Sequence, residues 1–423
     1  MPVPPSTPTD VVLNGRHTVF TTNANDVTVT GGNGNFRITD HGNDATITLG
    51  NGDQIITATG TENIITIGDT TGRNGLSVIT TGGDSIVTAG DGNVVVNAGG
   101  DDNLISLGNG HDIVRATGTG NTVNVGDDSG VNNINTVITG GFATVTLGAG
   151  DNTVVAKGDA NSIMTLSPDT TGTEHIIAAG SFNFISIGNT PSDNTGGCGG
   201  GYNQGSNCGY GGGSNQGGCG DGSGQGSNCG SGGGSNQGGC GDGSGQPGGT
   251  GHGGGSLIYT GFHSFVSAGD GDNTIIGVGG QETIFDGTGD DTIFLLSGAT
   301  GSGSNTVFLG NGDNYVFLTG SFNTVLDGSG TDTISAGDGN DTFVMNALGG
   351  SDTIYNFNAT DQLNLSNLLG SLNLTPTEAG LAGNISVPEQ PDSNFGAGAV
   401  DTLITVTGSA GTANIALVNY DAG

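Results

Sequence analysis

A nine-residue period constrains this chain more than any other feature of its sequence. The period is clearest from Asn305 to Asp341, where a polar residue, Thr or Tyr, and an apolar residue recur as a triplet at every ninth position. A glycine-bearing turn precedes each triplet. A fixed step of this kind is typical of solenoids, in which each unit buries its apolar face against its neighbours. The sequence therefore predicts a repeat architecture.

The apolar residue of each unit is β-branched or aromatic, which favours a strand. A second apolar residue follows two positions later in many units, as at Leu49, Ala58 and Ile67, so both point to the inner face. We predict an all-β, parallel β-solenoid (a β-roll or β-helix) with two nonapeptide units, about eighteen residues, in each coil. The predicted inner residues are Phe20, Val29, Ile38, Ile47, Ile56, Ile65, Val78, Val87, Val96, Ile105, Val114, Val123, Val145, Val154, Ile163, Ile176, Ile185, Val266, Ile275, Ile284, Ile293, Val307, Val316, Val325, Ile334 and Phe343.

Interruptions of the period indicate where loops leave the solenoid. The step lengthens after Ile65, Val123 and Ile163, and a long insertion follows Ile185. Counted from Phe20, these breaks follow the sixth, twelfth, sixteenth and eighteenth units, which are all even numbers. With two units per coil, we expect all four to lie at one edge. The unit after Val123 has Thr136 in the apolar place, and a slip of one residue would bring in Val137.

The pattern divides the chain into five segments. They are an N-terminal tail (1–10), an N-terminal solenoid (11–189), a Gly/Cys-rich insert (190–255), a C-terminal roll (256–357) and a C-terminal cap (358–423). Within the cap, Thr375, Pro376 and Glu378 predict the start of a helix. Residues 401–406 and 412–418 predict a hairpin. A cap of this kind protects the last strands of a solenoid.

The insert contains all the cysteines of the chain and a 21-residue internal repeat. One interpretation is a flexible Gly/Ser-type loop. Another is a set of glycine-rich extended passes held by disulfides or backbone packing. A metal site is less favoured, because no Cys-x-x-Cys spacing occurs. The odd number of thiols leaves one for contact with a partner chain. The five are Cys198, Cys208, Cys219, Cys229 and Cys240.

Charge limits the possible partners. With 5 basic and 39 acidic residues the formal net charge is −34, which disfavours nucleic acid and attracts divalent cations. We expect no transmembrane segment, and the first residues lack the features of a cleaved signal peptide. No Gly-x-Ser-x-Gly or His-Glu-x-x-His motif occurs and the six His are dispersed, so we do not expect an enzyme.

The sixth position of each unit is polar, mostly Asn or Asp, and equivalent residues one coil apart are expected to stack, as Asn314 on Asp332. Four segments, 108–114, 286–293, 327–334 and 336–343, resemble the RTX nonapeptide Gly-Gly-x-Gly-x-Asp-x-U-x. The resemblance implies Ca²⁺ held between turns by carboxylates and carbonyls. The implicated residues are Asp112, Asp286, Asp290, Asp291, Asp327, Asp332, Asp338, Asp341 and Asp352. Elsewhere position six is mainly Asn, which suits amide ladders, and plain turn formation explains both residue types as well.

The segment from Asp352 onward is similar to the C-terminal targeting region of RTX proteins exported by type I secretion. This resemblance implies an extracellular location, in solution or on the cell surface, and folding driven by calcium after export. We expect a secreted, non-catalytic structural protein of a surface layer, biofilm matrix or filament, assembled by head-to-tail stacking of solenoid ends. The alternative is a calcium-dependent adhesin that binds its ligand at the loop-bearing edge. Ice binding fits less well, because outward Thr-x-Thr pairs are sporadic.

Overall fold

The computed structural model describes residues 9–72, 75–128, 134–167, 173–189, 255–297, 303–346, 350–374, 384–387, 389–391 and 400–418. The chain divides into two compact units, one formed by Met1–Thr190 with Gly251–Gly423 and the other by Pro191–Thr250. The second unit holds the five cysteines and lies outside the described residues. The predicted helix start at Thr375 also lies outside them.

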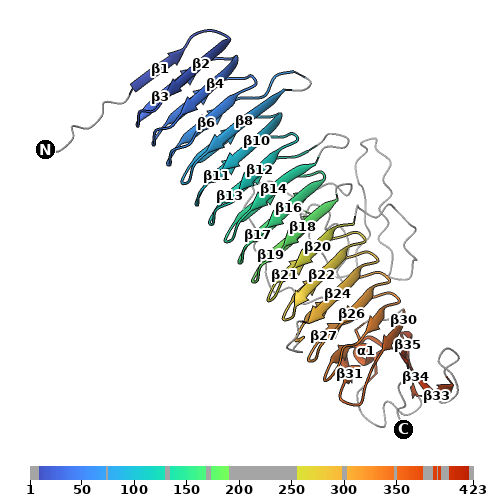
Figure 1. Cartoon of the computed structure of the whole chain (residues 1–423). Coiled ribbons are helices and arrows are strands. Elements are labelled where there is room, and N and C mark those ends of the chain that lie inside the picture. Colours follow the sequence, from blue (N-terminus) through green and yellow to red (C-terminus); the bar gives the residue numbers. More distant parts are fainter. Residues whose placement is uncertain are drawn as a thin grey trace, which may run out of the picture. The chain divides into compact units, whose positions relative to one another are not determined.

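The first unit is a parallel β-solenoid in which successive strands alternate between two sheets (Figure 1). This confirms the predicted fold class. Sheet A has sixteen strands: β1 (Thr9–Leu13), β3 (Val27–Gly31), β5 (Thr46–Leu49), β7 (Ile64–Ile67), β9 (Ile86–Ala89), β11 (Leu104–Ser106), β13 (Thr122–Val125), β15 (Thr144–Leu147), β17 (Ser162–Ser167), β19 (Phe184–Asn189), β21 (Phe265–Ser267), β23 (Thr283–Phe285), β25 (Thr306–Phe308), β27 (Thr324–Leu326), β29 (Thr342–Val344) and β31 (Gln362–Asn364).

Sheet B is built from the even-numbered strands, each of which pairs in parallel with the strand one coil away. Its strands are β2 (His17–Thr22), β4 (Asn35–Asp40), β6 (Ile55–Ala58), β8 (Leu76–Thr81), β10 (Asn93–Ala98), β12 (Ile113–Ala116), β14 (Asn135–Thr139), β16 (Asn152–Ala156), β18 (Glu174–Ala178), β20 (Leu257–Thr260), β22 (Thr274–Gly279), β24 (Thr292–Ser297), β26 (Tyr315–Leu318), β28 (Thr333–Ser335) and β30 (Ser351–Tyr355). Strand β18 pairs directly with β20, so the solenoid continues across the insert.

The core is a stack of Val, Ile and Leu between the two sheets, because period two turns these residues inward in every strand. The predicted inner residues are buried in nearly all coils, with Ile47 and Ile65 fully enclosed. Val78 is an exception: Ile79 is fully buried and Val78 points outward, so that prediction was wrong by one residue. The expected slip to Val137 is confirmed, since its side chain is fully buried.

Four of the longer connections share one edge of the solenoid. Those that follow β7, β13, β17 and β19 all lead from sheet A to sheet B, which confirms the prediction from even unit counts. We call this the A-to-B edge and the opposite one the B-to-A edge. A further long connection, between β24 and β25, lies at the B-to-A edge.

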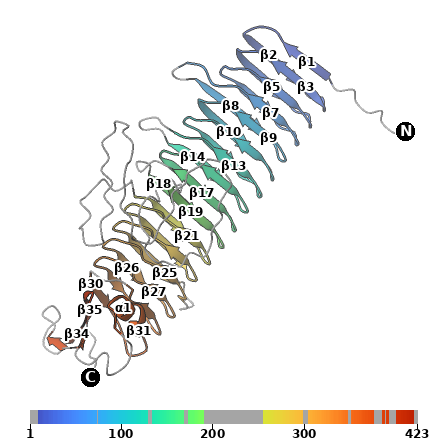
Figure 2. The same cartoon turned by 180° about the vertical axis from the view of Figure 1, so that it is seen from behind.

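The C-terminal residues cover the last coil (Figure 2). The predicted hairpin is present as antiparallel β34 (Val400–Gly408) and β35 (Gly411–Val418), and β35 extends sheet B by pairing with β30. Two short strands, β32 (Ile385–Ser386) and β33 (Glu389–Pro391), pair with β34. A helix that the sequence did not predict, α1 (Ser366–Ser371), follows β31 and buries Leu368 and Leu369. Among the described residues no helix has the length and apolar character to span a membrane.

Candidate metal centre

Two ladders of buried polar side chains line the inside of the solenoid, one at each edge. We call each ladder side chain a rung; in many rungs among the described residues, a side-chain oxygen accepts the backbone N–H of the equivalent residue one coil earlier. At the B-to-A edge the backbone N–H of Asn103 donates to Oδ1 of Asn121 at 3.0 Å. At the A-to-B edge the backbone N–H of Asn314 donates to Oδ1 of Asp332 at 2.8 Å. The predicted stacking of position-six residues is therefore present, and this hydrogen bond is the same for Asn and Asp.

The second atom of the side chain distinguishes the two residue types. In Asn rungs, Nδ2 donates to carbonyl oxygens of its own turn, from Asn63 to Gly60 at 2.7 Å and from Asn273 to Gly271 at 2.7 Å. Several carbonyls converge there because the glycine-rich turns bend tightly around the ladder residue. The place occupied by Nδ2 therefore requires a group with positive character.

In Asp rungs a second carboxylate oxygen takes that place. The Oδ2 atoms of Asp112, Asp291, Asp332 and Asp341 are buried without a hydrogen-bond partner among the described residues. Desolvation raises the pKa of Asp112 and Asp291 to about 7 and that of Asp341 to about 6. A buried carboxylate in this position is stable only when a proton or a cation neutralises it.

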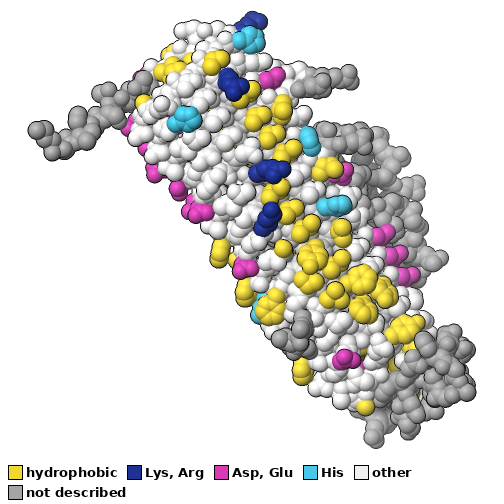
Figure 3. All heavy atoms as spheres, viewed as in Figure 1, with side chains coloured by type: hydrophobic (Ala, Val, Ile, Leu, Met, Phe, Trp, Pro, Cys, Tyr) yellow, Lys and Arg dark blue, Asp and Glu magenta, His cyan; other side chains and the backbone are white. Residues whose placement is uncertain are grey.

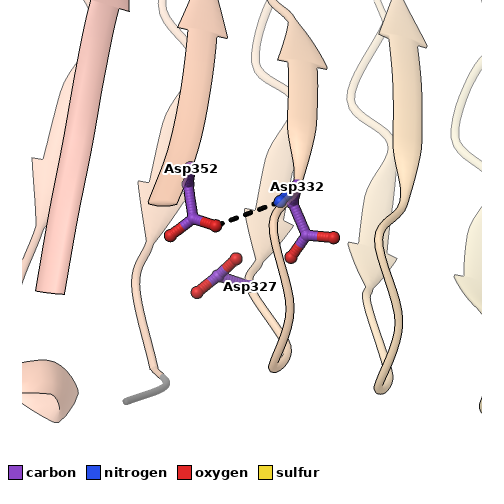
Figure 4. Close-up of side chains that lie close together, drawn as sticks. All are labelled: Asp327, Asp332 and Asp352. Atoms are coloured by element: carbon purple, nitrogen blue, oxygen red, sulfur yellow. Dashed lines mark hydrogen bonds between the residues drawn. The ribbon is translucent and has the colours of Figure 1, made fainter. Parts of the chain in front are cut away.

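Three carboxylates come together at the A-to-B edge beside the cap (Figure 4). Asp327 follows β27, Asp332 precedes β28, and Asp352 lies in β30; one oxygen of each lies within 4.8 Å of the others. The amide of Asp332 donates to Oδ1 of Asp352 at 3.1 Å. The three are 4%, 0% and 8% exposed, so water cannot screen their mutual repulsion.

The electrostatics of this cluster favour neutralisation. Burial raises the pKa of Asp327, and the charges of Asp352 and Asp332 raise it further. Burial also raises the pKa of Asp332. It raises the pKa of Asp352 to about 6, with the charge of Asp332 as a smaller cause. Oδ1 of Asp327 and Oδ2 of Asp332 have no hydrogen-bond partner in the described part of the chain when both groups are ionised, and a proton on Asp327 lets the two side chains share a hydrogen bond.

These residues fit a hard divalent cation. Such ions take oxygen ligands, and Ca²⁺ accepts six to eight of them in flexible geometry. The cluster offers three carboxylates from two consecutive coils. The turns approach closely at this point, since a Cβ added to Gly350 would overlap the carbonyl oxygen of Gly330. The arrangement shows a buried triple-Asp group able to hold a metal ion.

The structure separates the other predicted ligands. Asp286 and Asp291 lie at the same edge in an earlier coil, and burial and the charge of Asp291 raise the pKa of Asp286 to about 8. Asp341 lies at the B-to-A edge, and Asp112 lies in the N-terminal half of the solenoid. Asp290 and Asp338 are exposed on the turns.

Sequence reasoning missed three further carboxylates at ladder positions. Glu174 and Glu282 are 2% and 1% exposed, and each has one oxygen without a hydrogen-bond partner among described residues. Asp361 accepts the amide of Asp341 at 2.8 Å and thus continues the B-to-A ladder. All three lie two residues before an inward aliphatic residue, and this place is position six of the repeat. Counting every residue at position six, and not only Asn and Asp of the clear repeats, would have found them.

No family model, no curated protein and no solved structure matches this chain. The relation to RTX proteins is therefore a resemblance of turn motifs, and what is established is a parallel β-solenoid with a buried carboxylate cluster able to hold a metal ion.

Proposed function

We propose that this chain is a secreted, non-catalytic structural protein whose C-terminal coils are completed by Ca²⁺ and which assembles with copies of itself. The observation that carries the proposal is the buried group of Asp327, Asp332 and Asp352 beside the cap. Three charges in such a site oppose folding when no cation is present, and their neutralisation links closure of the last coils to binding of the ion.

The distribution of Asn and Asp supports a structural role for the ion. Asn rungs fill the carbonyl-lined space with an amide nitrogen and need no metal, as at Asn103 and Asn161. Asp rungs gather in the coils before the cap, together with the triple-Asp cluster. Calcium therefore acts on the C-terminal coils, and the N-terminal coils are held by backbone hydrogen bonds, amide ladders and the aliphatic core.

The large negative charge supports secretion before folding. At a net charge of −34 the chain repels itself when compact, and a calcium-poor cytosol offers little neutralisation. Outside the cell, calcium relieves the repulsion in the buried cluster. Fusing residues 352–423 to a reporter tests the export step: a type I exporter is expected to secrete the fusion, and a reporter retained in the cell contradicts this part of the proposal.

A calcium titration of the full chain tests the folding step. We expect chelator-treated protein to show reduced β-structure by circular dichroism, and Ca²⁺ to restore it with a higher melting temperature. Mg²⁺ at the same concentration is the control, since its smaller, strictly octahedral shell suits this cluster poorly. Negative-stain microscopy of the calcium-loaded protein is expected to show assemblies. Unchanged β-structure and melting temperature in chelator would contradict the calcium-linked role.

A second candidate function is a ligand-binding module. The observation that favours it is the shared edge, since the connections after β7, β13, β17 and β19 all leave the solenoid on one side. Loops gathered on a rigid scaffold are common recognition surfaces. Stable monomers in calcium, with ligand binding lost when the connection between Gly68 and Gly75 is shortened, would favour this function over assembly.

A further inference from the structure

The outer face of sheet B carries a continuous apolar stripe. In seven consecutive strands, from β14 to β26, the residues at one register position are all apolar or aromatic. The members of this sheet B stripe are Ile138, Val155, Ile177, Tyr259, Ile276, Phe294 and Phe317. Figure 3 shows the resulting band of hydrophobic side chains over these strands. Six spacings of ~4.8 Å make the stripe roughly 29 Å long.

Neighbouring positions widen the stripe. Leu257, Leu296 and Tyr315 are 40%, 39% and 40% exposed, and Ile177, next to the central member Tyr259, is 44% exposed. The rings of Phe294 and Phe317 lie 6.3 Å apart across adjacent coils. Single exposed apolar residues are ordinary on protein surfaces, whereas a contiguous patch of this extent marks an interaction site.

Charge is arranged so that this face can approach another protein. No outward position in strands β2 to β30 of sheet B is Asp or Glu. Arg37, Arg115 and Lys157 are instead exposed on or beside strands of sheet B, toward the N-terminal side of the stripe. The outer face of sheet A from β3 to β31 also lacks Asp and Glu, but its strands carry no basic residue at a described outward position. In a chain with a net charge of −34, sheet B is therefore the long face with a local excess of positive charge.

We infer that the outer face of sheet B is the surface through which two copies of this chain pack side by side, with their solenoid axes antiparallel. The inference rests on the proposed assembling role and names its interface. When the stripe lies opposite itself, the two-fold axis passes at β20 and strands β10 to β30 overlap, a face of roughly 48 Å by 13 Å, about 620 Å² on each copy. The pair therefore buries roughly 1,240 Å² in total, above the ~1,000 Å² that a specific interface needs.

The antiparallel arrangement follows from the position of the basic residues. In a parallel pair, Arg37 and Arg115 of one copy would face the same residues of the other. In an antiparallel pair centred on the stripe, Arg115 in β12 lies over β28, whose described outward positions hold no basic residue, and Arg37 lies beyond the overlap. The stripe remains opposite itself because two-fold symmetry makes the contact self-complementary.

The two ends of the solenoid are less suited to this contact. At the C-terminal end, β34 and β35 extend sheet B, and α1 follows the last strand of sheet A. At the N-terminal end, β1 and β2 each pair on one side only, so strand-edge pairing between copies is the competing arrangement.

Sedimentation velocity on the calcium-loaded full chain, with two matched variants, tests the inference. Ile177→Lys places a charge within the stripe, one strand from its centre, and Ile64→Lys makes the same change on sheet A, where Ile64 is 43% exposed. We expect concentration-dependent dimers, a dissociation constant raised about tenfold or more by Ile177→Lys, and no change from Ile64→Lys. Circular dichroism in calcium confirms that both variants are folded.

The outcomes separate this inference from the proposed function. The sheet B interface is overturned if the two variants change assembly to the same extent, or if neither changes it. If folding still needs calcium in that case, the calcium role is left intact. Monomers at all concentrations overturn the inference and the assembling role together. A photo-crosslinking residue at position 177 is expected to capture sheet B of a second copy; capture of β1, β2 or the insert overturns the inference.

Discussion

Asn314 and Asp332 occupy equivalent rungs of one ladder in consecutive coils, and the backbone N–H of Asn314 donates to Oδ1 of Asp332 at 2.8 Å. They differ in the atom that faces the turn. Nδ2 of Asn314 donates to Gly312 at 3.3 Å, while Oδ2 of Asp332 has no hydrogen-bond partner among described residues. The solenoid therefore has two kinds of rung. In an Asn rung the side-chain amide nitrogen donates to turn carbonyls, and in an Asp rung the second carboxylate oxygen needs a proton or a cation.

Asp332→Asn converts the second kind of rung into the first. We expect the variant to melt at a higher temperature than the parent in chelator, because Nδ2 then meets the turn carbonyls and one buried charge is removed. Calcium binding measured by isothermal titration calorimetry should weaken at least tenfold, because a carboxylate ligand is lost. Asp338→Asn, an exposed change of equal chemistry, is the control and should alter neither quantity. Equal calcium affinity in Asp332→Asn and the parent would exclude Asp332 as a ligand.

Asn103→Asp makes the opposite change in the N-terminal coils. Nδ2 of Asn103 donates to the carbonyl oxygens of Gly99 and Gly100 and to Oδ1 of Asn121. In the variant a carboxylate oxygen takes the place of Nδ2 and faces these three oxygens. We expect a loss of about 1–3 kcal/mol in the free energy of unfolding at neutral pH, the cost of an unsatisfied buried group. Urea denaturation measures it, with Asn97→Asp on the outer face of β10 as the control. A variant as stable as the parent would show that the ladder amides contribute little.

Glu174 makes stability depend on pH. Burial raises its pKa from 4.5 to about 8, with the charge of Asp151 as a smaller cause. The folded state therefore keeps a proton that the unfolded state releases between pH 4.5 and 8. Stability is greatest below this window and falls as pH rises through it, by up to about 1.4 kcal/mol per pH unit.

Glu174→Gln should make the decline shallower by the contribution of this one group and stabilise the protein near pH 8, because the amide carries no charge and still accepts from Nδ2 of Asn152. Urea denaturation of both proteins across the window provides the comparison. Parallel pH profiles for the variant and the parent would show that Glu174 is not protonated in the folded state.

Gly60 is required by close approach of neighbouring turns. A Cβ at this position would overlap the carbonyl oxygen of Gly42 one coil away, whereas a Cβ on Gly32 would meet nothing within 4 Å. We expect Gly60→Ala to lower the free energy of unfolding by about 1–3 kcal/mol, the usual effect of overpacking. Gly32→Ala should stay within about 0.5 kcal/mol of the parent. Thermal melts of the pair check the difference, and equal melting temperatures would contradict the tight stacking of turns.

The nine-residue period predicted the coils because the inward residues and the pairing partners of the strands recur with the same period. The inner position, the stacking of ladder residues and the common edge of the four connections after β7, β13, β17 and β19 all follow from counting residues in steps of nine. Counting failed where a connection changed length, as at Ile79, because the break around residues 68–75 shifts the inner position by one relative to the count. Period alone does not determine where a strand resumes after an irregular loop.

The candidate site was predictable in its residue types and only partly in its grouping. Asp332 and Asp352 lie in consecutive coils, so stacking brings them together, while Asp327 joins them through the turn between β27 and β28. The repeat could not distinguish a turn carboxylate that points inward, such as Asp327, from an exposed one, such as Asp338, because both occur in similar glycine-rich segments. Helix α1 falls outside the period, and nothing in the repeat predicts it.

Hydrogen exchange measured by mass spectrometry, with and without calcium, tests the central claim most directly. The amides of β27–β31 should be protected in calcium and exchange at least tenfold faster in chelator, because the triple-Asp cluster then lacks its cation. The amides of β11–β17, where Asn rungs predominate at the B-to-A edge, should show the same protection in both conditions. Equal protection of β27–β31 with and without calcium would contradict the account.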